Sequence, residues 1–277
     1  MTCKHLVVSV CCAVIIGSAL LPGTALPAMS RNGFDYSDAL VPADEIVWGG
    51  VPRDGILDRH EVVNDRFAAE AIVVTYCPLC FSGMAFTAQI EGIDLQFGVS
   101  GLLYNSDVLL FDYRTESLWS QIMSKAISGP LKGVDIAAIP TAHTTWRDWR
   151  DRHPDTLVLS TDTGFRINYN QSPYRDYQRS GQLMFPVRHR NNAYRNKELV
   201  LGIRIGGVQK AYPFKELRAH GESSFSDSVG GTKLTIEWQE DDKYARAIDS
   251  KGNEIPSVIV YWFAWYAFHP GTEVFSH

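Results

Sequence analysis

L199-V-L-G-I-R-I-G-G-V-Q-K-A-Y212 is the clearest secondary-structure signal in the sequence. Apolar residues alternate with other residues on both sides of a Gly206-Gly207 pair, and a period of two is typical of β-strands. Paired glycines supply the positive φ angles that a tight two-residue turn needs. The segment therefore predicts a β-hairpin.

Two further stretches have the same pattern. A85-F-T-A-Q-I90 and I93-D-L-Q-F-G-V99 flank the turn residues Glu91 and Gly92. This arrangement pairs Ile90 with Ile93, Ala88 with Leu95 and Phe86 with Phe97, and we expect all six on one face. E45-I-V-W, G-G and V51-P-R form a similar element. With short helices expected only near 144–152 and 261–268, the sequence predicts a β-rich α+β fold.

The sequence also repeats itself. W146-R-D-W-R-D-R-H-P-D-T-L-V158 matches W262-F-A-W-Y-A-F-H-P-G-T-E-V274 without a gap at both tryptophans, the His-Pro pair, the threonine and the valine. Self-similarity at this level indicates a tandem duplication with two unequal repeat halves built from hairpins. The expected organisation, with both halves packed as one domain, is a signal peptide at 1–28, a first repeat at 29–162, a connector at 163–198 and a shorter second repeat at 199–277.

The two halves differ in length. His60 and His153 are 93 positions apart, whereas His220 and His269 are 49 positions apart. The first half therefore carries an extra segment of about forty residues, which includes or adjoins the C-x-x-C pair. A duplicated scaffold with cysteines in one copy suggests that this copy carries the chemistry.

The amino terminus has the features of a secretory signal peptide. Lys4 precedes the apolar run Leu6–Leu21, and small residues follow. The run is shorter than the roughly twenty residues that span a bilayer. We expect cleavage after Ala25 or Ala28, export to the periplasm or the extracellular space, and no membrane span in the mature chain.

Signal-peptide removal changes the composition in two useful ways. Loss of Lys4 moves the formal net charge from −5 to −6, and three of the five cysteines leave with the peptide. An acidic chain without a basic face is a poor nucleic-acid ligand. The expected partners are a small molecule or a metal ion, and protein partners are left open.

The remaining cysteines, in T75-Y-C-P-L-C-F81, support a metal site. Two thiolates at this spacing chelate one soft ion, copper or zinc, and imidazoles complete the shell. We expect Cys77, Cys80 and His60 as the ligands, because His60 precedes the cysteine-bearing strand. His143 and His189 are further options.

Two other interpretations of the pair stay open. A proline after the first cysteine is typical of thiol-disulfide oxidoreductases, but those place a helix after the motif, and here Ser82-Gly83 and a hairpin follow. Redox chemistry would need another scaffold. The pair could also form a structural disulfide, although so short a loop stabilises little through chain entropy.

The cluster Y104-N-S-D107 lies in the extra segment. Such residues suit a tight turn, and they also suit a pocket beside the cysteines. Tyr104 and Asp107, together with Cys77 and Cys80, are therefore the candidate catalytic residues. Trp119 and Gln121 are expected near the same pocket, and Asp112 is expected in a hairpin.

Other conspicuous residues have structural explanations. His153 and His269 end amphipathic runs just before a proline, where a histidine suits a helix C-terminus, and the nearby tryptophans are expected in the core. The segment 163–186 holds three tyrosines and three arginines. It is expected to be a surface crossover rather than the lining of a cleft.

Together these motifs resemble a known family. The motifs are H60-E-V-V-N-D, V74-T-Y-C-P-L-C, F97-G-V-S-G-L-L-Y-N-S-D, S117-L-W-S-Q, S128-G-P-L-K-G, T145-W-x-x-W-x-x-x-H-P and V200-L-G-I-R-I-G-G-x-x-K-A-Y-P-F. They are similar to Domain of Unknown Function 3179 (DUF3179), over nearly all of residues 45–277. The resemblance implies an exported bacterial or archaeal protein without an assigned reaction. It marks C-P-L-C and Y-N-S-D as signature motifs and transfers no catalytic role.

The leading hypothesis from the sequence is a soft-metal site, copper before zinc, with metal-dependent redox chemistry as one use. The alternatives are a metal-free thiol-disulfide oxidoreductase and a non-enzymatic module that binds a ligand between its halves and keeps a structural disulfide. The sequence does not decide whether the protein is an enzyme.

Overall fold

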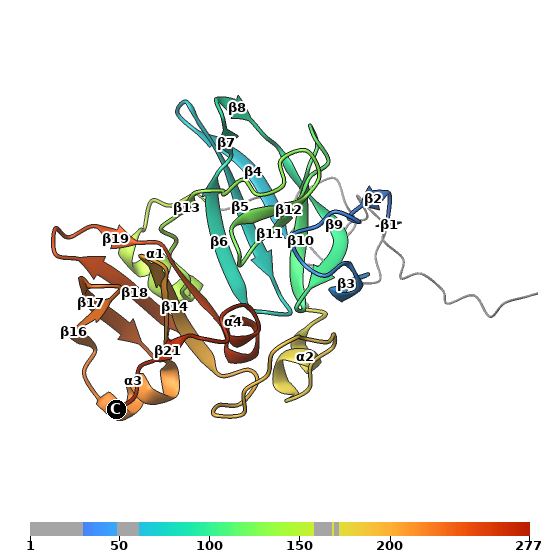
Figure 1. Cartoon of the computed structure of the whole chain (residues 1–277). Coiled ribbons are helices and arrows are strands. Elements are labelled where there is room, and N and C mark those ends of the chain that lie inside the picture. The colour runs from blue at the N-terminus through green and yellow to red at the C-terminus, as the bar shows by residue number, and fades with distance from the viewer. Residues whose placement is uncertain (1–29, 49–60, 158–167, 169–171) are drawn as a thin grey trace, which may run out of the picture.

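The computed structural model describes residues 30–48, 61–157, 168 and 172–277. This part of the chain is β-rich, as the hairpin patterns predicted, and its strands form several small sheets with four short α-helices (Figure 1). The Gly49-Gly50 turn and His60 lie outside the described residues. No helix in the described part is both long enough and apolar enough to cross a membrane.

The first half contains a four-stranded antiparallel sheet that carries the cysteines. Its spatial order is β13-β6-β5-β4. The strands are β4 (Val62–Phe67), β5 (Glu70–Cys77), β6 (Ser82–Thr87) and β13 (Ala138–Ile139).

Residues 97–128 supply most of a second, five-stranded sheet. Its order is β12-β11-β10-β9-β3. The strands are β3 (Ile46–Trp48), β9 (Phe97–Tyr104), β10 (Asp107–Asp112), β11 (Leu118–Ser120) and β12 (Lys125–Ser128). Smaller elements nearby are β1 (Ser30–Arg31), β2 (Phe34–Asp35), the 3₁₀ turn η1 (Ala43–Glu45), β7 (Gln89–Ile90) and β8 (Ile93–Asp94).

The second half also contains two four-stranded sheets. One has the order β20-β14-β15-β21 and is antiparallel except for the β15–β21 pair, and the other is an antiparallel meander in chain order, β16 to β19. The strands are β14 (Leu199–Ile205), β15 (Val208–Pro213), β16 (Ser224–Val229), β17 (Thr232–Gln239), β18 (Tyr244–Asp249), β19 (Glu254–Ile255), β20 (Ser257–Tyr261) and β21 (Glu273–Val274). The helices are α1 (Trp146–Arg152), α2 (Arg175–Arg179), α3 (Phe214–His220) and α4 (Trp262–Phe268).

The hairpin at 199–212 is confirmed in full. Strands β14 and β15 pair with Ile205 opposite Val208, so Gly206 and Gly207 alone form the turn. Their φ angles of 57° and 82° lie in the left-handed region that favours glycine.

The hairpin at 85–99 is confirmed near its turn and wrong further out. Ile90 pairs with Ile93, and the Leu95 N–H donates to the Ala88 carbonyl at 2.8 Å. Beyond that point the two predicted strands enter different sheets, because β6 pairs with β5 whereas β9 pairs with β10. Phe86 and Phe97 are therefore not cross-strand partners. Ile93, 38% exposed, does not share the buried face of the other five.

The two predicted helices end where expected. The backbone N–H of His153 bonds to the Trp149 carbonyl at 2.8 Å, and His269 makes the same bond to Trp265 at 2.9 Å. In each segment the tryptophan indole N–H also donates to the hydroxyl of the threonine three residues after the histidine, at 3.1 Å and 2.8 Å. This bond gives a physical reason for the matched tryptophans and threonines.

The tryptophans of the two helices differ in burial. Trp262 and Trp265 are in the core as predicted, but Trp146 is 52% exposed and α1 has no buried residue. Helix α1 is held by polar contacts, since Thr145 donates through its hydroxyl to the Asp242 carboxylate of the β17–β18 turn at 2.8 Å. The prediction of a core position is wrong for Trp146.

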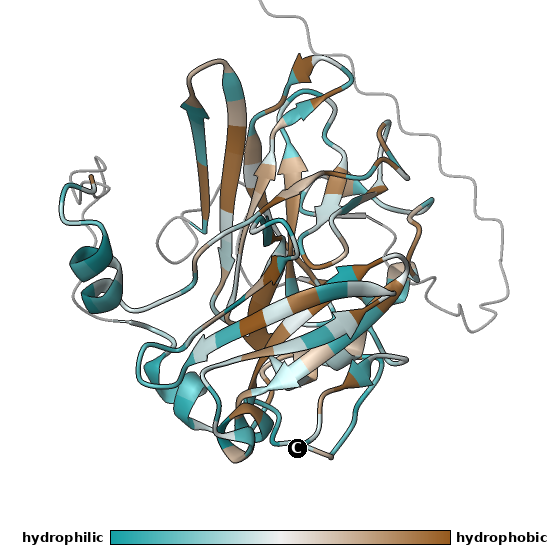
Figure 2. Ribbon diagram, turned by 90° about the vertical axis from the view of Figure 1, so that its left-hand side faces the viewer, coloured by the Kyte–Doolittle hydropathy of each residue, from teal (hydrophilic) through white to brown (hydrophobic). Residues whose placement is uncertain are grey.

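The largest hydrophobic cluster joins the two halves. It contains Phe86 and Ala88 from the first half and Val260, Trp262 and Trp265 from the second. Figure 2 shows hydrophobic residues concentrated in the central strands and hydrophilic residues in the outer loops and helices. The cysteines lie within this shared cluster.

Candidate functional site

The C-P-L-C motif forms a tight turn between two antiparallel strands. Strand β5 ends at Cys77, and the Cys80 N–H donates to the Cys77 carbonyl at 3.2 Å before β6 begins at Ser82. Proline suits the second position of such a turn because its ring fixes φ. No helix follows the motif, which agrees with the sequence-based argument against a thioredoxin-like fold. Both cysteines are free and buried.

The Y-N-S-D motif forms a second turn, between β9 and β10. Asn105 and Ser106 are its two central residues, and both have positive φ angles, 51° and 68°. Two such residues define the primed turn that matches the twist of a hairpin. The turn aims the Ser106 carbonyl at the cysteines: it lies 3.3 Å from the Cys80 sulfur and 3.9 Å from the Cys77 sulfur.

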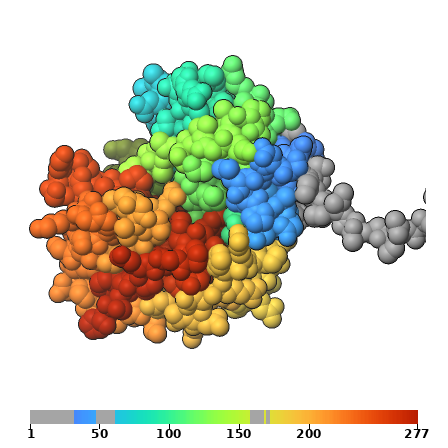
Figure 3. All heavy atoms as spheres, viewed as in Figure 1, coloured from blue at the N-terminus to red at the C-terminus, as the bar shows by residue number. Residues whose placement is uncertain are grey.

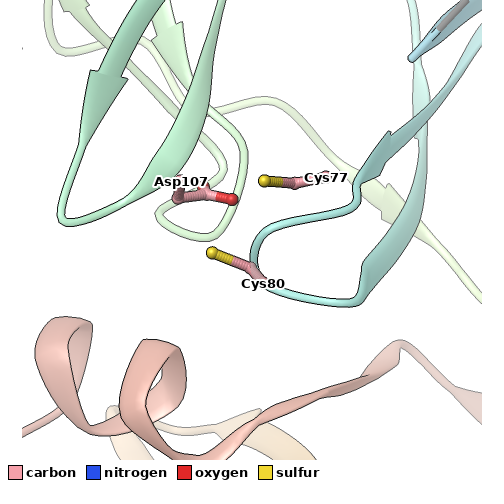
Figure 4. Close-up of side chains that lie close together, drawn as sticks. All are labelled: Cys77, Cys80 and Asp107. Atoms are coloured by element: carbon pink, nitrogen blue, oxygen red, sulfur yellow. The ribbon is translucent and has the colours of Figure 1, made fainter. Parts of the chain in front are cut away.

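Asp107 follows that turn and completes a group of three. One carboxylate oxygen of Asp107 and the sulfurs of Cys77 and Cys80 all lie within 4.8 Å of one another. Figure 4 shows this oxygen directed toward the space between the two sulfurs. Oδ2 accepts a bond from the Ile122 N–H at 3.2 Å, whereas Oδ1 is buried and has no hydrogen-bond partner among the described residues.

Burial makes each member of the group hard to ionise. It raises the pKa of Cys77 and raises that of Cys80 well above its usual range, and the nearby Asp107 charge acts in the same direction. Burial also raises the pKa of Asp107 to about 7, although its bond from Ile122 partly opposes the shift. A thiol with a raised pKa is a poor nucleophile, because the thiolate is the reactive form.

Polar side chains beside the cysteines fix the two strands that carry them. The Ser82 hydroxyl donates to Gln121 Oε1 at 2.7 Å, and Gln121 Nε2 donates to the Thr75 hydroxyl at 2.8 Å. Gln121 thus links the two strands that flank the cysteine turn. Trp119 instead donates to Asp112 at 3.0 Å.

Asp112 has the hairpin role that the sequence predicted. Its carboxylate accepts bonds from the backbone N–H of Arg114 at 3.2 Å and of Thr115 at 2.6 Å. These bonds close the turn after β10. Asp112 is therefore tied to local structure and not to the cysteines.

Tyr104 is not brought to the cysteines. It lies in a separate hydrophobic cluster with Leu102 and Leu109, and its ring meets Phe268 edge-on at 5.5 Å between centroids. His60, the predicted third ligand, falls outside the described residues. Within the described residues, the group close enough for shared coordination contains no histidine.

His143 lies near the cysteine turn without joining this group. Its ring stacks on Phe81 with 4.7 Å between centroids, and its Nδ1 is buried without a hydrogen-bond partner among the described residues. Burial, followed by the charge of Lys243, lowers the pKa of His143 to about 4. The imidazole is therefore neutral at physiological pH.

A cavity of about 60 Å³ lies beside Cys77. Its lining is mainly apolar and comes from the cysteine turn, the five-stranded sheet and the connector; it comprises Glu61, Cys77, Leu79, Val99, Gly101, Leu102, Leu103, Val108, Tyr174, Met184 and Phe185. Met184, 55% exposed, is the least buried of the apolar lining residues. Glu61 is a functional candidate that the sequence reasoning missed, and its negative charge contributes to the raised pKa of Cys77. The one feature of the sequence that pointed to Glu61 was its position next to His60, the predicted metal ligand.

The connector covers the cysteine turn. The Tyr177 hydroxyl donates to the Leu79 carbonyl at 3.0 Å, and the ring of Tyr177 is buried. The space-filling view shows this yellow segment packed between the first half and the red C-terminal segment (Figure 3). Part of the segment expected to be a surface crossover therefore encloses the site.

Comparison with known proteins places the chain in one family. A search of curated proteins found no match, and a search of solved structures found none. The model of the family described as Protein of unknown function (DUF3179) matches residues 51–272, which is most of the chain. The chain therefore belongs to the DUF3179 family.

Proposed function

We propose that Cys77, Cys80 and Asp107 bind a metal ion, with zinc the preferred ion. One observation carries this proposal: a carboxylate oxygen of the buried Asp107 lies within 4.8 Å of two buried sulfurs, and Asp107 Oδ1 has no hydrogen-bond partner among the described residues. A buried polar atom without a partner costs free energy. A cation between the three donor atoms would satisfy it.

The electrostatics of the group point in the same direction. Burial raises the pKa of all three groups, so without a nearby positive charge the ionised form of each is disfavoured. A divalent ion supplies that charge and stabilises the thiolates and the carboxylate. Metal binding would displace the protons, as it does in other thiolate sites.

The donor atoms favour zinc over copper. The hypothesis from the sequence put copper first and took His60 as the third ligand, whereas the described structure brings a carboxylate to the two cysteines. Zinc accepts sulfur and carboxylate oxygen in tetrahedral sites, and Cu(I) prefers soft sulfur donors. Zinc at this position would act as a Lewis acid, whereas copper would support electron transfer.

Three protein donors are typical of reactive rather than closed zinc sites, because they leave a fourth position open. The Ser106 carbonyl, 3.3 Å from the Cys80 sulfur, is one candidate for that position. The cavity of about 60 Å³ beside Cys77 is another source of ligands. A cavity needs only about 10–15 Å³ to hold a water, so this one is large enough.

The runner-up is a metal-free thiol-disulfide oxidoreductase. It is favoured by the tight turn, which brings both sulfurs to one carbonyl oxygen. The raised pKa of both thiols argues against it, because a reactive dithiol needs a thiolate near neutral pH.

Elemental analysis and thiol titration of the purified mature protein separate these functions. We expect about one zinc per chain, lost in Cys77→Ser and retained in Asp112→Asn, which alters a buried aspartate outside the site. No metal, with a dithiol that oxidises reversibly, would favour the runner-up. No metal, with a permanent disulfide, would leave a structural role.

We also propose that the two halves arose by duplication and pack as one domain. The strands β4-β5-β6 and β16-β17-β18 are both antiparallel and consecutive along the chain. The shared Trp-His-Thr arrangement after α1 and α4 supports the same relationship. Residues 199–277 expressed alone would expose the shared core, so we expect them not to fold, which circular dichroism would show.

Export is a further proposal that rests on the sequence alone. Cleavage after Ala25 or Ala28 would remove Lys4 and three cysteines. Mass determination of the protein from a periplasmic or culture fraction checks the cleavage site. An intact amino terminus in the cytoplasmic fraction would contradict export.

A further inference from the structure

We propose that a second site, in a cleft between the two halves, binds a small organic carboxylate with an apolar body. The cleft has a volume of about 400 Å³, within the usual range for small-molecule sites. Strand β6 and strand β13 form one wall, and β14, β20 and α4 form the other. The residues that carry the argument are Ile122, Ile139, Gly202, Arg204, Val258 and Trp265.

Two glycines leave one end of the cleft open, and a third lets Trp265 pack closely against β14. Gly206 and Gly207 form the β14–β15 turn at one end. At Gly202 a Cβ atom would come within 2.3 Å of the Trp265 ring, so glycine there lets the indole lie against β14. The lining combines apolar side chains such as Ile139 with polar groups, which suits a ligand with both an apolar body and a charged end.

Arg204 gives the cleft a positive charge that no described residue neutralises through an ion pair. Its guanidinium donates to the Met123 carbonyl at 3.1 Å and to the Ser124 hydroxyl at 2.7 Å. Both acceptors are neutral, and these bonds use two of the five N–H groups of the side chain. The charge of Asp135 acts on the pKa of Arg204, but the two side chains form no ion pair among the described contacts. An anion would find unused donors and an unpaired charge.

The cleft lining contains one positively charged side chain, so we expect a ligand with a single negative charge. Arg204 is the only basic residue among its lining residues. His269, whose ring packs on Trp265 at 4.3 Å, is neutral because burial, and then the Arg204 charge, lowers its pKa to about 3. One positive charge matches a monoanion, and a planar guanidinium suits a carboxylate. A phosphate dianion would be left partly unpaired.

This site is distinct from the candidate metal centre and does not depend on it. Ile122 lies between them: its side chain lines the cleft, and its backbone N–H donates to Asp107. The ligand would therefore contact Ile122 without reaching the sulfurs. Binding can be measured in the full mature protein whatever metal it holds.

Titration calorimetry with benzoate, its neutral isostere benzamide, and phenyl phosphate tests the proposal. We expect benzoate to bind at least about tenfold more tightly than benzamide, because a hydrogen bond to a charged group is worth roughly 1.5–3 kcal/mol. Arg204→Gln should reduce benzoate binding to the benzamide level. Arg218→Gln should not, because Arg218, on α3, pairs with Glu240 and does not line the cleft.

A second variant keeps the test valid if Arg204→Gln does not fold. Ile139→Trp would fill the cleft without changing its charge and should weaken both benzoate and benzamide. Equal binding of the two probes, unchanged binding in Ile139→Trp, or no binding up to about 10 mM benzoate would overturn the proposal. Tighter binding of phenyl phosphate than of benzoate would overturn the monoanion assignment.

Discussion

Asp107 and Cys80 belong to the turns of two different hairpins, and their side-chain donor atoms lie within 4.8 Å of each other in the protein interior. The Ser106 carbonyl joins them, 3.3 Å from the Cys80 sulfur. Neither turn brings a basic side chain into the group of three donors. Two signature motifs that are separate in the sequence thus form one acidic centre that suits a cation.

Asp107→Asn tests the carboxylate as a donor. The change keeps the shape of the side chain and removes its charge, so we expect zinc affinity to fall by at least about tenfold. Competition with a chromophoric chelator measures the affinity. Asp249→Asn, at an exposed turn of the second half, is the control and should bind zinc normally. Wild-type affinity in Asp107→Asn would exclude the carboxylate from the site.

Ser106→Gly tests the cost of the turn that positions Asp107. Ser106 has a φ of 68°, a conformation that costs a residue with a Cβ about 1–2 kcal/mol. Glycine removes this strain but gains freedom in the unfolded chain. We expect a net stabilisation of up to about 1 kcal/mol in urea unfolding. Ser226→Gly, within strand β16, should instead destabilise the protein, and equal destabilisation by both changes would contradict a strained turn.

His143 should make the protein sensitive to acid. Its pKa is about 4 in the folded protein, compared with 6.5 for an ordinary histidine. The unfolded chain therefore binds the proton first, and the stability present above pH 6.5 is lost as the pH falls toward 4. The difference corresponds to at most about 3 kcal/mol. His143→Phe keeps the stack on Phe81 and should lose less stability between pH 7 and pH 4.5 in urea unfolding; the same loss as in the wild type would contradict a neutral, buried imidazole.

Gly202→Ala tests the packing of the second half. The added Cβ would lie 2.3 Å from the Trp265 ring, closer than atoms can pack. We expect a loss of about 3 kcal/mol in the free energy of unfolding, since overpacking a core typically costs 1–3 kcal/mol. Gly271→Ala has no neighbour within 4 Å of the new atom and should change stability by less than about 0.5 kcal/mol. Similar effects of the two changes would contradict the close approach of Trp265 to β14.

Local features of the structure were predictable from the sequence. Residue alternation and Gly-Gly turns located the hairpin at 199–212, and the turn residues of Y-N-S-D predicted both a tight turn and a position beside the cysteines. Proline after a histidine placed both helix ends. Each of these signals depends only on residues close together in the sequence, whose backbone preferences determine the local structure.

Long-range features were not predictable in the same way. Alternation shows that Phe86 and Phe97 lie on buried faces, but not that their strands enter different sheets. Periodicity places Trp146 on one face of α1, but not whether that face is covered. The position of Tyr104 away from the cysteines, and the cover that Tyr177 gives them, likewise depend on tertiary packing. Pattern alone does not encode such contacts.

X-ray absorption at the zinc edge of the zinc-loaded mature protein tests the metal centre most directly. The account predicts two sulfur neighbours at about 2.3 Å and oxygen neighbours at about 2.0–2.2 Å. In Cys77→Ser the sulfur shell should fall to one neighbour, and in Asp112→Asn it should be unchanged. A zinc environment without sulfur, or a sulfur shell that Cys77→Ser leaves intact, would contradict the assignment of Cys77 and Cys80 as ligands.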